Sequence, residues 1–204
     1  MKVSAKVAVE NRARILAAAD RLIRRDGMAQ ASIARIADAA GLTHGALYRH
    51  FADKDALAAE AVAAGFGPIL SRLGEMPAGT GAAPYAALYL SPDHRDHFPW
   101  GCPVAALAHE IHRHPPVVAE AFVDGVERNL EAIARLLDGP EARARAIVTL
   151  SLLSGALSLA RAAAASGDLA LSSEILSTVR ASILQAEAMP PATGERVDPH
   201  PGAG

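Results

Sequence analysis

The sequence predicts an all-helical protein. Ala and Leu, both strong helix formers, dominate the composition, whereas runs of β-branched residues are scarce. Apolar residues recur three or four positions apart through most of the chain, which is the period of one helix face. With 204 residues, of which 51% are hydrophobic, the chain is long enough for one or two small domains with a buried core.

Composition also indicates the compartment. No stretch reaches the ~18 uninterrupted apolar residues that a membrane span needs. The first 14 residues contain no apolar core of a secretion signal. The single cysteine, Cys102, excludes an internal disulfide and fits a reducing environment. We therefore expect a cytoplasmic protein that makes no contact with a membrane.

The charge is unevenly distributed along the chain. Residues 1–60 carry ten Lys or Arg against seven Asp or Glu, a net charge of +3. The remainder carries ten against fifteen, a net charge of −5, so the whole chain has −2. A basic N-terminal part on an acidic body favours contact between that part and a polyanion.

The first expected helix spans residues 10–25 and follows a mobile arm over residues 1–9. Arginines occupy much of its polar side, and Gly27 is a stop signal after it. Its apolar face consists of Ile15, Ala19, Leu22 and Ile23.

Two short helices follow, joined by a glycine turn. Ser32 can cap the first, residues 33–40, because its hydroxyl can accept a hydrogen bond from a free N–H in the first turn. Gly41 ends this helix, since glycine tolerates the left-handed backbone common just past a helix. Thr43 can cap the second, residues 44–51, in the same way as Ser32, and Asp53 can cap the next helix, which starts near Lys54.

The rest of the chain also has helical periodicity. Residues 141–165 are apolar nearly all round and are expected to be buried on several sides. Residues 91–101 read as irregular, and residues 190–204, rich in Pro and Gly, read as a disordered tail. The expected helices span residues 54–66, 84–90, 102–112, 117–137, 141–165 and 169–188.

Two short helices joined by a tight turn suit the reading of DNA. The first can cross the sugar–phosphate backbone while the second lies in the major groove. In the second helix, Leu47 and Phe51 can face the core. The residues left for its outer side are polar or small: Thr43, His44, Gly45, Ala46, Tyr48 and His50.

These residues resemble a known family signature. The run from Ser32 to Phe51 (SIARIADAAGLTHGALYRHF), followed by Lys54 and Leu57, closely resembles that of the tetracycline-repressor (TetR) family. The resemblance covers residues 12–60, a little more than a quarter of the chain.

The resemblance implies a three-helix helix-turn-helix head (residues 1–53) on an all-helical effector-binding and dimerisation domain (residues 54–189). It implies a non-enzymatic regulator that binds a double-stranded operator as a homodimer and usually represses. A small-molecule effector would move the two heads apart and lower operator affinity.

By match of position, two groups of residues would touch DNA. Thr43, His44, Gly45 and Ala46 would lie at the bases. Ser32, Arg35, Tyr48, His50 and Lys54 would lie on the DNA backbone. Arg35, like Arg49, fits equally well as a solvated surface residue.

The last two long helices, residues 141–165 and 169–188, match the family's dimer interface. The first carries small residues such as Gly155 that allow close helix approach, and it is too apolar to face water. The alternative is that both helices form the core of the monomer.

The effector site is expected to be an apolar pocket between the middle helices. No cofactor or metal is assigned to it. The residues expected to line it are Phe66, Tyr85, Leu88, Tyr89, Trp100, Cys102, Leu107, Phe122 and Val126.

Cys102 has further interpretations. A helix start favours the thiolate, so Cys102 could sense electrophiles or oxidants, and with His94, His97 or His109 it could serve an enzyme as nucleophile and base. A buried core thiol is the other interpretation. His109 and His112, three apart on one expected helix, have a spacing that can bind metal, although solvated histidines fit equally.

Overall fold

The computed structural model describes residues 5–97 and 101–188, and every regular element in these two ranges is helical. The elements are α1 (Ala5–Asp26), α2 (Ile33–Ala40), α3 (His44–Leu47), α4 (Lys54–Gly65), α5 (Gly67–Glu75), α6 (Ala83–Tyr89), α7 (Pro92–Asp96), α8 (Pro103–Leu107), the 3-10 turn η2 (Ile111–Arg113), α9 (Pro116–Leu136), α10 (Ala142–Ala165) and α11 (Leu169–Ala188).

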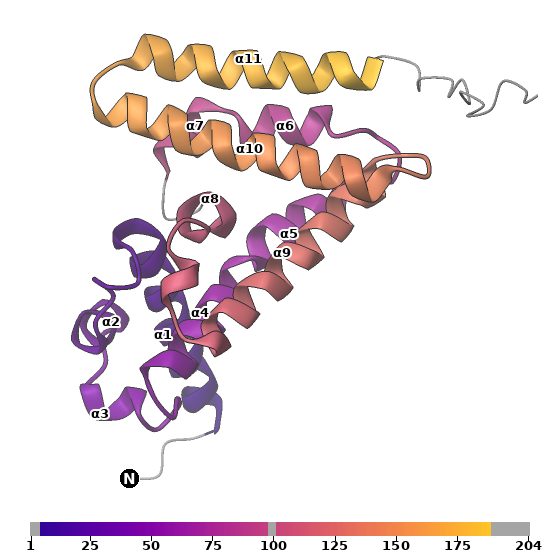
Figure 1. Ribbon diagram of the computed structural model, residues 1–204. Coiled ribbons are helices and arrows are strands. Elements are labelled where there is room, and N and C mark those ends of the chain that lie inside the picture. The colour runs from indigo at the N-terminus through magenta and orange to yellow at the C-terminus, as the bar shows by residue number, and fades with distance from the viewer. Residues whose placement is uncertain (1–4, 98–100, 189–204) are drawn as a thin grey trace, which may run out of the picture.

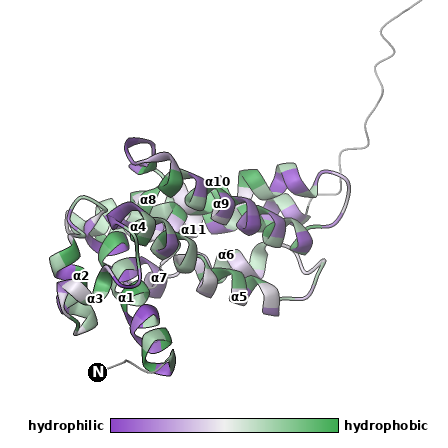
Figure 2. Cartoon of the chain, turned by 90° about the horizontal axis from the view of Figure 1, so that it is seen from below, coloured by the Kyte–Doolittle hydropathy of each residue, from purple (hydrophilic) through white to green (hydrophobic). Residues whose placement is uncertain are grey.

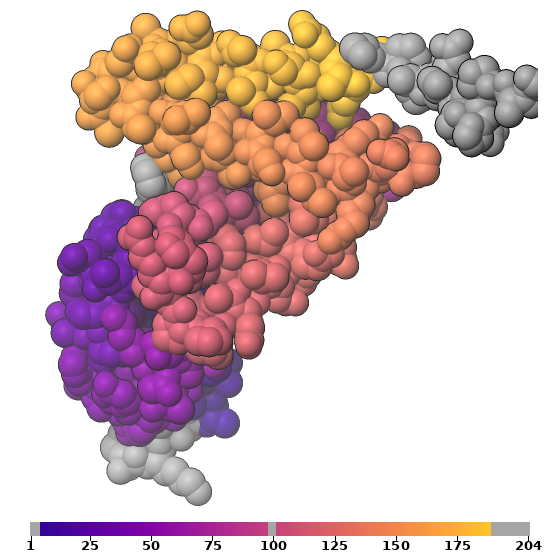
Figure 3. All heavy atoms as spheres, in the orientation of Figure 1, coloured from indigo at the N-terminus to yellow at the C-terminus, as the bar shows by residue number. Residues whose placement is uncertain are grey.

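The molecule has a head at one end and a long helical pair at the other (Figure 1). Helices α1 to α3 form the head, and α4 joins it to the body because α4 packs on both α1 and α9. Helices α10 and α11 lie side by side and antiparallel, and α9 packs beneath α10. The space-filling view places the head and the α10–α11 pair at opposite ends (Figure 3).

A continuous apolar core runs from the head into the body. In the head it contains Ile15, Ile36 and Leu47, and in the body Phe66 and Ile133, all almost fully buried. The helices carry hydrophobic and hydrophilic residues together, as Figure 2 shows. Their apolar sides face this core, so the burial of one side of each helix explains the expected periodicity.

Several predicted boundaries are wrong. Helix α1 begins at Ala5, within the expected mobile arm. The helix expected over residues 54–66 is followed directly by α5, which begins anew because Pro68 has no N–H and cannot continue a helix from its interior. The segment expected to be irregular contains α7. The expected tail, residues 190–204, lies outside the described residues.

Helix α10 is buried on one side and exposed on the other. Leu150, Leu153 and Leu157 face the body and are almost fully buried. Val148 and Leu159, by contrast, are 58% and 62% exposed in the single chain. Burial on several sides was therefore the wrong expectation for one chain, and an apolar face remains uncovered.

Two helical stretches, Lys54–Glu75 and Ala142–Ala165, pass a length and composition test for membrane spans. Core helices of soluble proteins pass the same test, and here both stretches contribute buried residues to the core.

Close packing around Gly125 of α9 generates a stability prediction. A Cβ at this position would lie 2.3 Å from the Phe66 ring, far inside van der Waals contact. Gly125→Ala should lower the free energy of unfolding by about 1–3 kcal/mol, measured by urea denaturation. Gly74→Ala in α5 is the matched control, since a Cβ there meets no atom within 4 Å, and it should not destabilise. Equal stability of the two variants would contradict this packing argument.

Candidate nucleic-acid interface and ligand cavity

The helix-turn-helix rests on α1. The inner sides of α2 and α3, which include Ile36, Ala40 and Leu47, are buried in one cluster with Ile15 and Leu22 of α1. Phe51, just after α3, is also buried, as expected. The apolar face of α1 thus fixes the orientation of both short helices.

The predicted caps of α2 and α4 are confirmed. The Ser32 hydroxyl accepts a hydrogen bond from the Arg35 N–H at 3.3 Å. Gly41 ends α2 in the left-handed conformation, with φ +64°. The Asp53 carboxylate accepts from the Ala56 N–H at 2.7 Å and caps α4. These contacts satisfy backbone groups that would otherwise lack partners at helix ends.

Helix α3 is shorter than expected. It ends at Leu47 and continues as a hydrogen-bonded turn to Phe51, whose N–H donates to the Leu47 carbonyl at 3.0 Å. Thr43 occupies the N-cap position, but its side chain makes no capping bond, which corrects the prediction.

The outer side of α3 is open. Thr43, His44 and Gly45 are exposed, and Tyr48 is 58% exposed. Ala46 is only 6% exposed, so the prediction that it lies open on the outer side is wrong. The exposed surface formed by Thr43, His44, Gly45 and Tyr48 is named the reading face.

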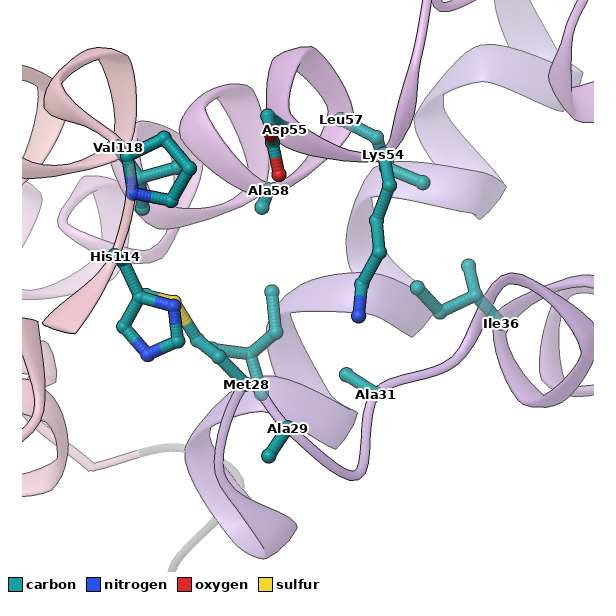
Figure 4. A pocket seen from close by; sticks show the side chains of 12 residues that line it. Met28, Ala29, Ala31, Ile36, Lys54, Asp55, Leu57, Ala58, His114 and Val118 are labelled. Carbon is teal, nitrogen blue, oxygen red and sulfur yellow. The ribbon is translucent and has the colours of Figure 1, made fainter.

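The predicted backbone-contacting residues border the reading face. Lys54 is exposed at the start of α4. Ser32 and His50 are half-buried. In Figure 4, Lys54 and His114 point toward one small opening between the head, α4 and the start of α9. Arg35 is partly engaged within the head, since its guanidinium donates to the Gln30 carbonyl at 2.8 Å and pairs with Asp26 at 2.5 Å.

Arginines of α1 support the head in ways the periodicity does not reveal. Arg14 donates to the Ala40 carbonyl at the end of α2, at 2.5 Å. Arg12 pairs with Glu60 of α4, and its guanidinium carbon lies 4.9 Å from the centre of the Phe51 ring. A cation over an aromatic face is attractive, so Arg12 holds α1, α4 and the end of the helix-turn-helix together.

The body contains a cavity between α5, α6 and α7, with a volume of about 130 Å³. The structure brings three predicted effector residues, Tyr85, Leu88 and Tyr89, into its lining. The sequence reasoning missed the other members of the lining as effector residues: Pro68, Ile69, Arg72, His94 and Gly101.

Other residues predicted for the pocket have core roles. Phe66 and Phe122 pack edge to face, with ring centres 5.8 Å apart. Leu107 is also buried in this core, and the half-buried Val126 packs against it. Trp100 lies outside the described residues.

His94 forms one wall of the cavity as a neutral imidazole. Its Nδ1 lies 2.7 Å from the Tyr89 carbonyl oxygen, which can only accept, so Nδ1 carries the proton. Its Nε2 then accepts from the Cys102 backbone N–H at 3.2 Å. Burial lowers the pKa of His94, and the positive charges of Arg161 and Arg72 act in the same direction.

Cys102 does not have the character of a reactive thiol. It is fully buried, and burial raises the pKa of the thiol even though the Tyr89 hydroxyl and the backbone N–H groups at the start of α8 act in the opposite direction. Reactive cysteines need a lowered pKa and access. The expectation of a thiolate favoured by the helix start is therefore wrong in direction, which also weakens the sensor and enzyme interpretations.

His109 and His112 do not share a helix. Helix α8 ends at Leu107, so His109 lies in a turn and His112 in η2. The premise of a helical metal-binding pair is wrong because the expected helix breaks. In the described ranges, no group of three or more His, Cys, Asp or Glu is placed to hold a metal ion.

Comparison with known proteins agrees with this geometry. The sequence model of the family "Bacterial regulatory proteins, tetR family" matches residues 15–61, which span the helix-turn-helix and its support on α1 and α4. Residues 15–61 thus belong to the TetR family. This TetR-family protein is a DNA-binding transcriptional regulator with a helix-turn-helix head and a helical body.

Solved structures share the fold across nearly the whole chain. The reduced form of NemR from E. coli has a TM-score of 0.72 at 18% identity, over 86% of this chain and 96% of NemR. A TetR-family transcriptional regulator from Streptomyces coelicolor has a TM-score of 0.64 at 25% identity, over 89% of this chain and 97% of its own. No curated protein sequence matches this TetR-family chain.

Hydrogen bonds link residues that line the cavity to the head and to α10. The buried Arg24 of α1 donates to the carbonyl of Gly101, a lining residue, at 2.5 Å. On the other side, Arg161 of α10 donates to the His94 carbonyl at 2.9 Å. The sequence placed Arg24 on a polar helix side, and its buried role follows only from the packing of α8 beside α1.

The neutral state of His94 generates a pH prediction. The unfolded residue takes up a proton near a pKa of about 6.5, whereas the folded residue stays neutral to lower pH. Stability should therefore be fully present above pH ~6.5 and decrease as the pH falls below it. His94→Gln should show a smaller decrease in free energy of unfolding between pH 7.5 and 5.5, measured with urea.

His112→Gln is the matched control for loss of an exposed imidazole. An unchanged pH dependence in His94→Gln would contradict the assignment, because Asp93, Arg72 and Arg161 remain around the site in that variant.

Proposed function

We propose that this chain is a ligand-responsive repressor that binds a near-palindromic operator as a homodimer and is released by a small-molecule effector. The observation that carries the proposal is the reading face, an exposed polar surface on a short helix that is fixed by a buried core. Such a face can enter the major groove, whereas a structural adaptor has no need of it.

Two kinds of DNA contact follow from this arrangement. Thr43, His44 and Gly45 lie on the outer side of α3, where they would meet base edges. Tyr48, His50, Ser32 and Lys54 border that surface and have donors for phosphate oxygens. The net charge of +3 over residues 1–60 supports attraction to the duplex.

The uncovered faces of α10 and α11 support a homodimer. A groove between them is lined by Val148, Leu152 and Ile183, and Gly155 offers space in which a partner helix can approach closely. Exposed apolar side chains of this area favour association. Such residues on the two helices are Ile147, Val148, Leu152, Leu159, Leu169, Leu171 and Leu184.

Release by an effector has a physical route. A ligand that displaces Gly101 or His94 would act on Arg24 of the head and on Arg161 of α10 through the hydrogen bonds already described. Because two heads on one dimer read half-sites about 34–36 Å or a multiple apart, a small change of head position lowers operator affinity. The protein would do this in the cytoplasm, without catalysing a reaction.

Selection of duplex fragments from the organism's own genome tests the proposal directly. The full chain should enrich fragments that contain a near-palindromic sequence, and the repeated half-site should be the operator. Failure to enrich any duplex at low salt would refute DNA recognition. Enrichment of sites without two-fold symmetry would refute binding as a symmetric dimer.

Phosphate contacts at Lys54 and Tyr48 generate a second measurement on the recovered operator. Lys54→Ala and Tyr48→Phe should weaken binding to all duplexes alike, and Lys54→Ala should reduce the magnitude of the log affinity–log salt slope by about one unit per half-site. Fluorescence anisotropy at several salt concentrations measures both.

Arg128→Ala in the body is the control, because it removes a positive charge from α9 without changing the head. If Lys54→Ala keeps the affinity and salt dependence of this control, the assignment of Lys54 to the DNA backbone is wrong.

The α10 face generates a prediction on assembly. Val148→Asp combined with Leu159→Asp would bury unpaired carboxylates in the dimer, so the variant should sediment as a monomer. It should also lose most of its affinity for the two-site operator. Val123→Asp on α9, at a position 62% exposed like Leu159, is the matched control and should remain dimeric. A dimeric double variant would place the interface elsewhere.

A further inference from the structure

The cavity between α5, α6 and α7 has buried tyrosine hydroxyls in its lining. The hydroxyls of Tyr85 and Tyr89 are inaccessible to solvent, and that of Tyr85 has no hydrogen-bond partner in the part of the chain that the structure describes. The Tyr89 hydroxyl lies beside the thiol of Cys102, which is only a weak hydrogen-bond partner. Both tyrosines are at least 99% buried and line the cavity. A buried polar group left unpaired costs about 1–3 kcal/mol, so the Tyr85 hydroxyl, next to a weakly partnered Tyr89 hydroxyl, requires an explanation.

These hydroxyls can donate. Burial raises the pKa of both tyrosines well above the ordinary value, so both remain protonated. The two rings pack edge to face with centres 5.6 Å apart, and Tyr89 packs on His94 at 4.6 Å, which fixes the rings. His94 itself is fully used, because both of its nitrogens already have backbone partners.

The lining of the cavity carries positive charge and no negative charge. Arg72 lines the cavity, and no hydrogen bond or ion pair engages its guanidinium within the described residues. The lining contains no Asp or Glu. Arg161, behind His94, adds to the positive field there. A cationic ligand would be repelled by this lining, and an anionic one would be attracted.

The walls are apolar and the space is small. Pro68, Ile69 and Leu88 provide apolar contact area. The inner cavity of about 130 Å³ is smaller than the ~300–1,000 Å³ pockets that hold drug-sized ligands. It adjoins an outer groove of about 480 Å³, because Arg72, Leu88 and His94 line both.

The outer groove contains one acidic residue. The carboxylate of Asp93 is mostly solvated, so its charge is screened by water. Arg72 therefore remains the charged group that the inner and outer spaces share.

We propose that this cavity binds a compact organic carboxylate, whose anionic group accepts hydrogen bonds from Arg72 and the Tyr85 and Tyr89 hydroxyls while its apolar body contacts Ile69 and Leu88. This inference rests on the proposed ligand-responsive function and names the chemical class of the effector. It gives the Tyr85 hydroxyl a partner, the Tyr89 hydroxyl a stronger one than the Cys102 thiol, and the exposed guanidinium of Arg72 an opposite charge. It also puts the ligand against His94 and Gly101, which are bonded to α10 and α1.

Matched probes test the carboxylate directly. Benzoate and hexanoate, their neutral amides benzamide and hexanamide, and the cation benzylamine are titrated into the full-length protein by calorimetry. At least one carboxylate should bind about tenfold or more tightly than its amide, because charge-assisted hydrogen bonds are roughly twice as strong as neutral ones. Benzylamine should bind most weakly, and added salt should weaken only the carboxylate.

Variants assign the contacts. Arg72→Gln should remove the preference for carboxylate over amide, whereas Arg128→Gln, which removes an exposed arginine paired with Asp124, should keep it. Tyr85→Phe and Tyr89→Phe should each weaken carboxylate binding severalfold. Thermal unfolding should show that Tyr85→Phe is not less stable, since it removes a hydroxyl that lacks a partner.

The outcomes separate the two proposals. Equal binding of carboxylate and amide, failure of both carboxylates to bind, or an unchanged preference in Arg72→Gln would overturn the ligand class. If one of these outcomes is found but the protein still enriches palindromic duplexes, the regulator proposal stands and this inference alone fails. If no duplex is enriched, the proposed function fails, and carboxylate binding would then be a property of the cavity alone.

Discussion

The burial of the α2 and α3 inner sides against α1 is the interaction on which the rest of the structure depends. Helix α3 has four residues, far fewer than the ~12–15 that an isolated helix needs to be even marginally stable in water. It persists because Leu47 is buried beside Ile15 and Ile36. The same anchoring leaves Thr43, His44 and Tyr48 outside, so the stability of the head and the exposure of its reading face have one cause.

Helix α4 extends this constraint into the body. It packs on α1 at one end of the molecule and on α9 at the other, and Arg12 reaches Glu60 along it. Two hydrogen bonds also join the head and the body: Glu110 accepts the Met28 N–H at 3.2 Å, and Arg24 donates to Gly101. Helix α8 packs beside α1 as well, so a displacement of the body at these contacts would act on the head.

The body combines an apolar core with a polar cavity wall. Phe66 and Phe122 pack against each other as ordinary core residues. Tyr85 and Tyr89 differ because their hydroxyls are buried, the first without a partner and the second beside the Cys102 thiol, next to the exposed Arg72. Buried polar groups are usually satisfied, so this cavity departs from the packing that stability alone favours. That departure is what separates a binding site from the surrounding core.

The sequence by itself determined the helical class, the Ser32, Gly41 and Asp53 end signals and the reading face, because these depend on residues close together in the chain. It could not determine the burial of Ala46, the breaks that separate His109 from His112, or the buried role of Arg24. Only the tertiary structure decided these features and the meeting of Arg72 with Tyr85, Tyr89 and His94. The physical reason is that local propensity and periodicity say which side of a helix is apolar, whereas burial, pKa shifts and unpaired donors depend on which distant segments pack against it.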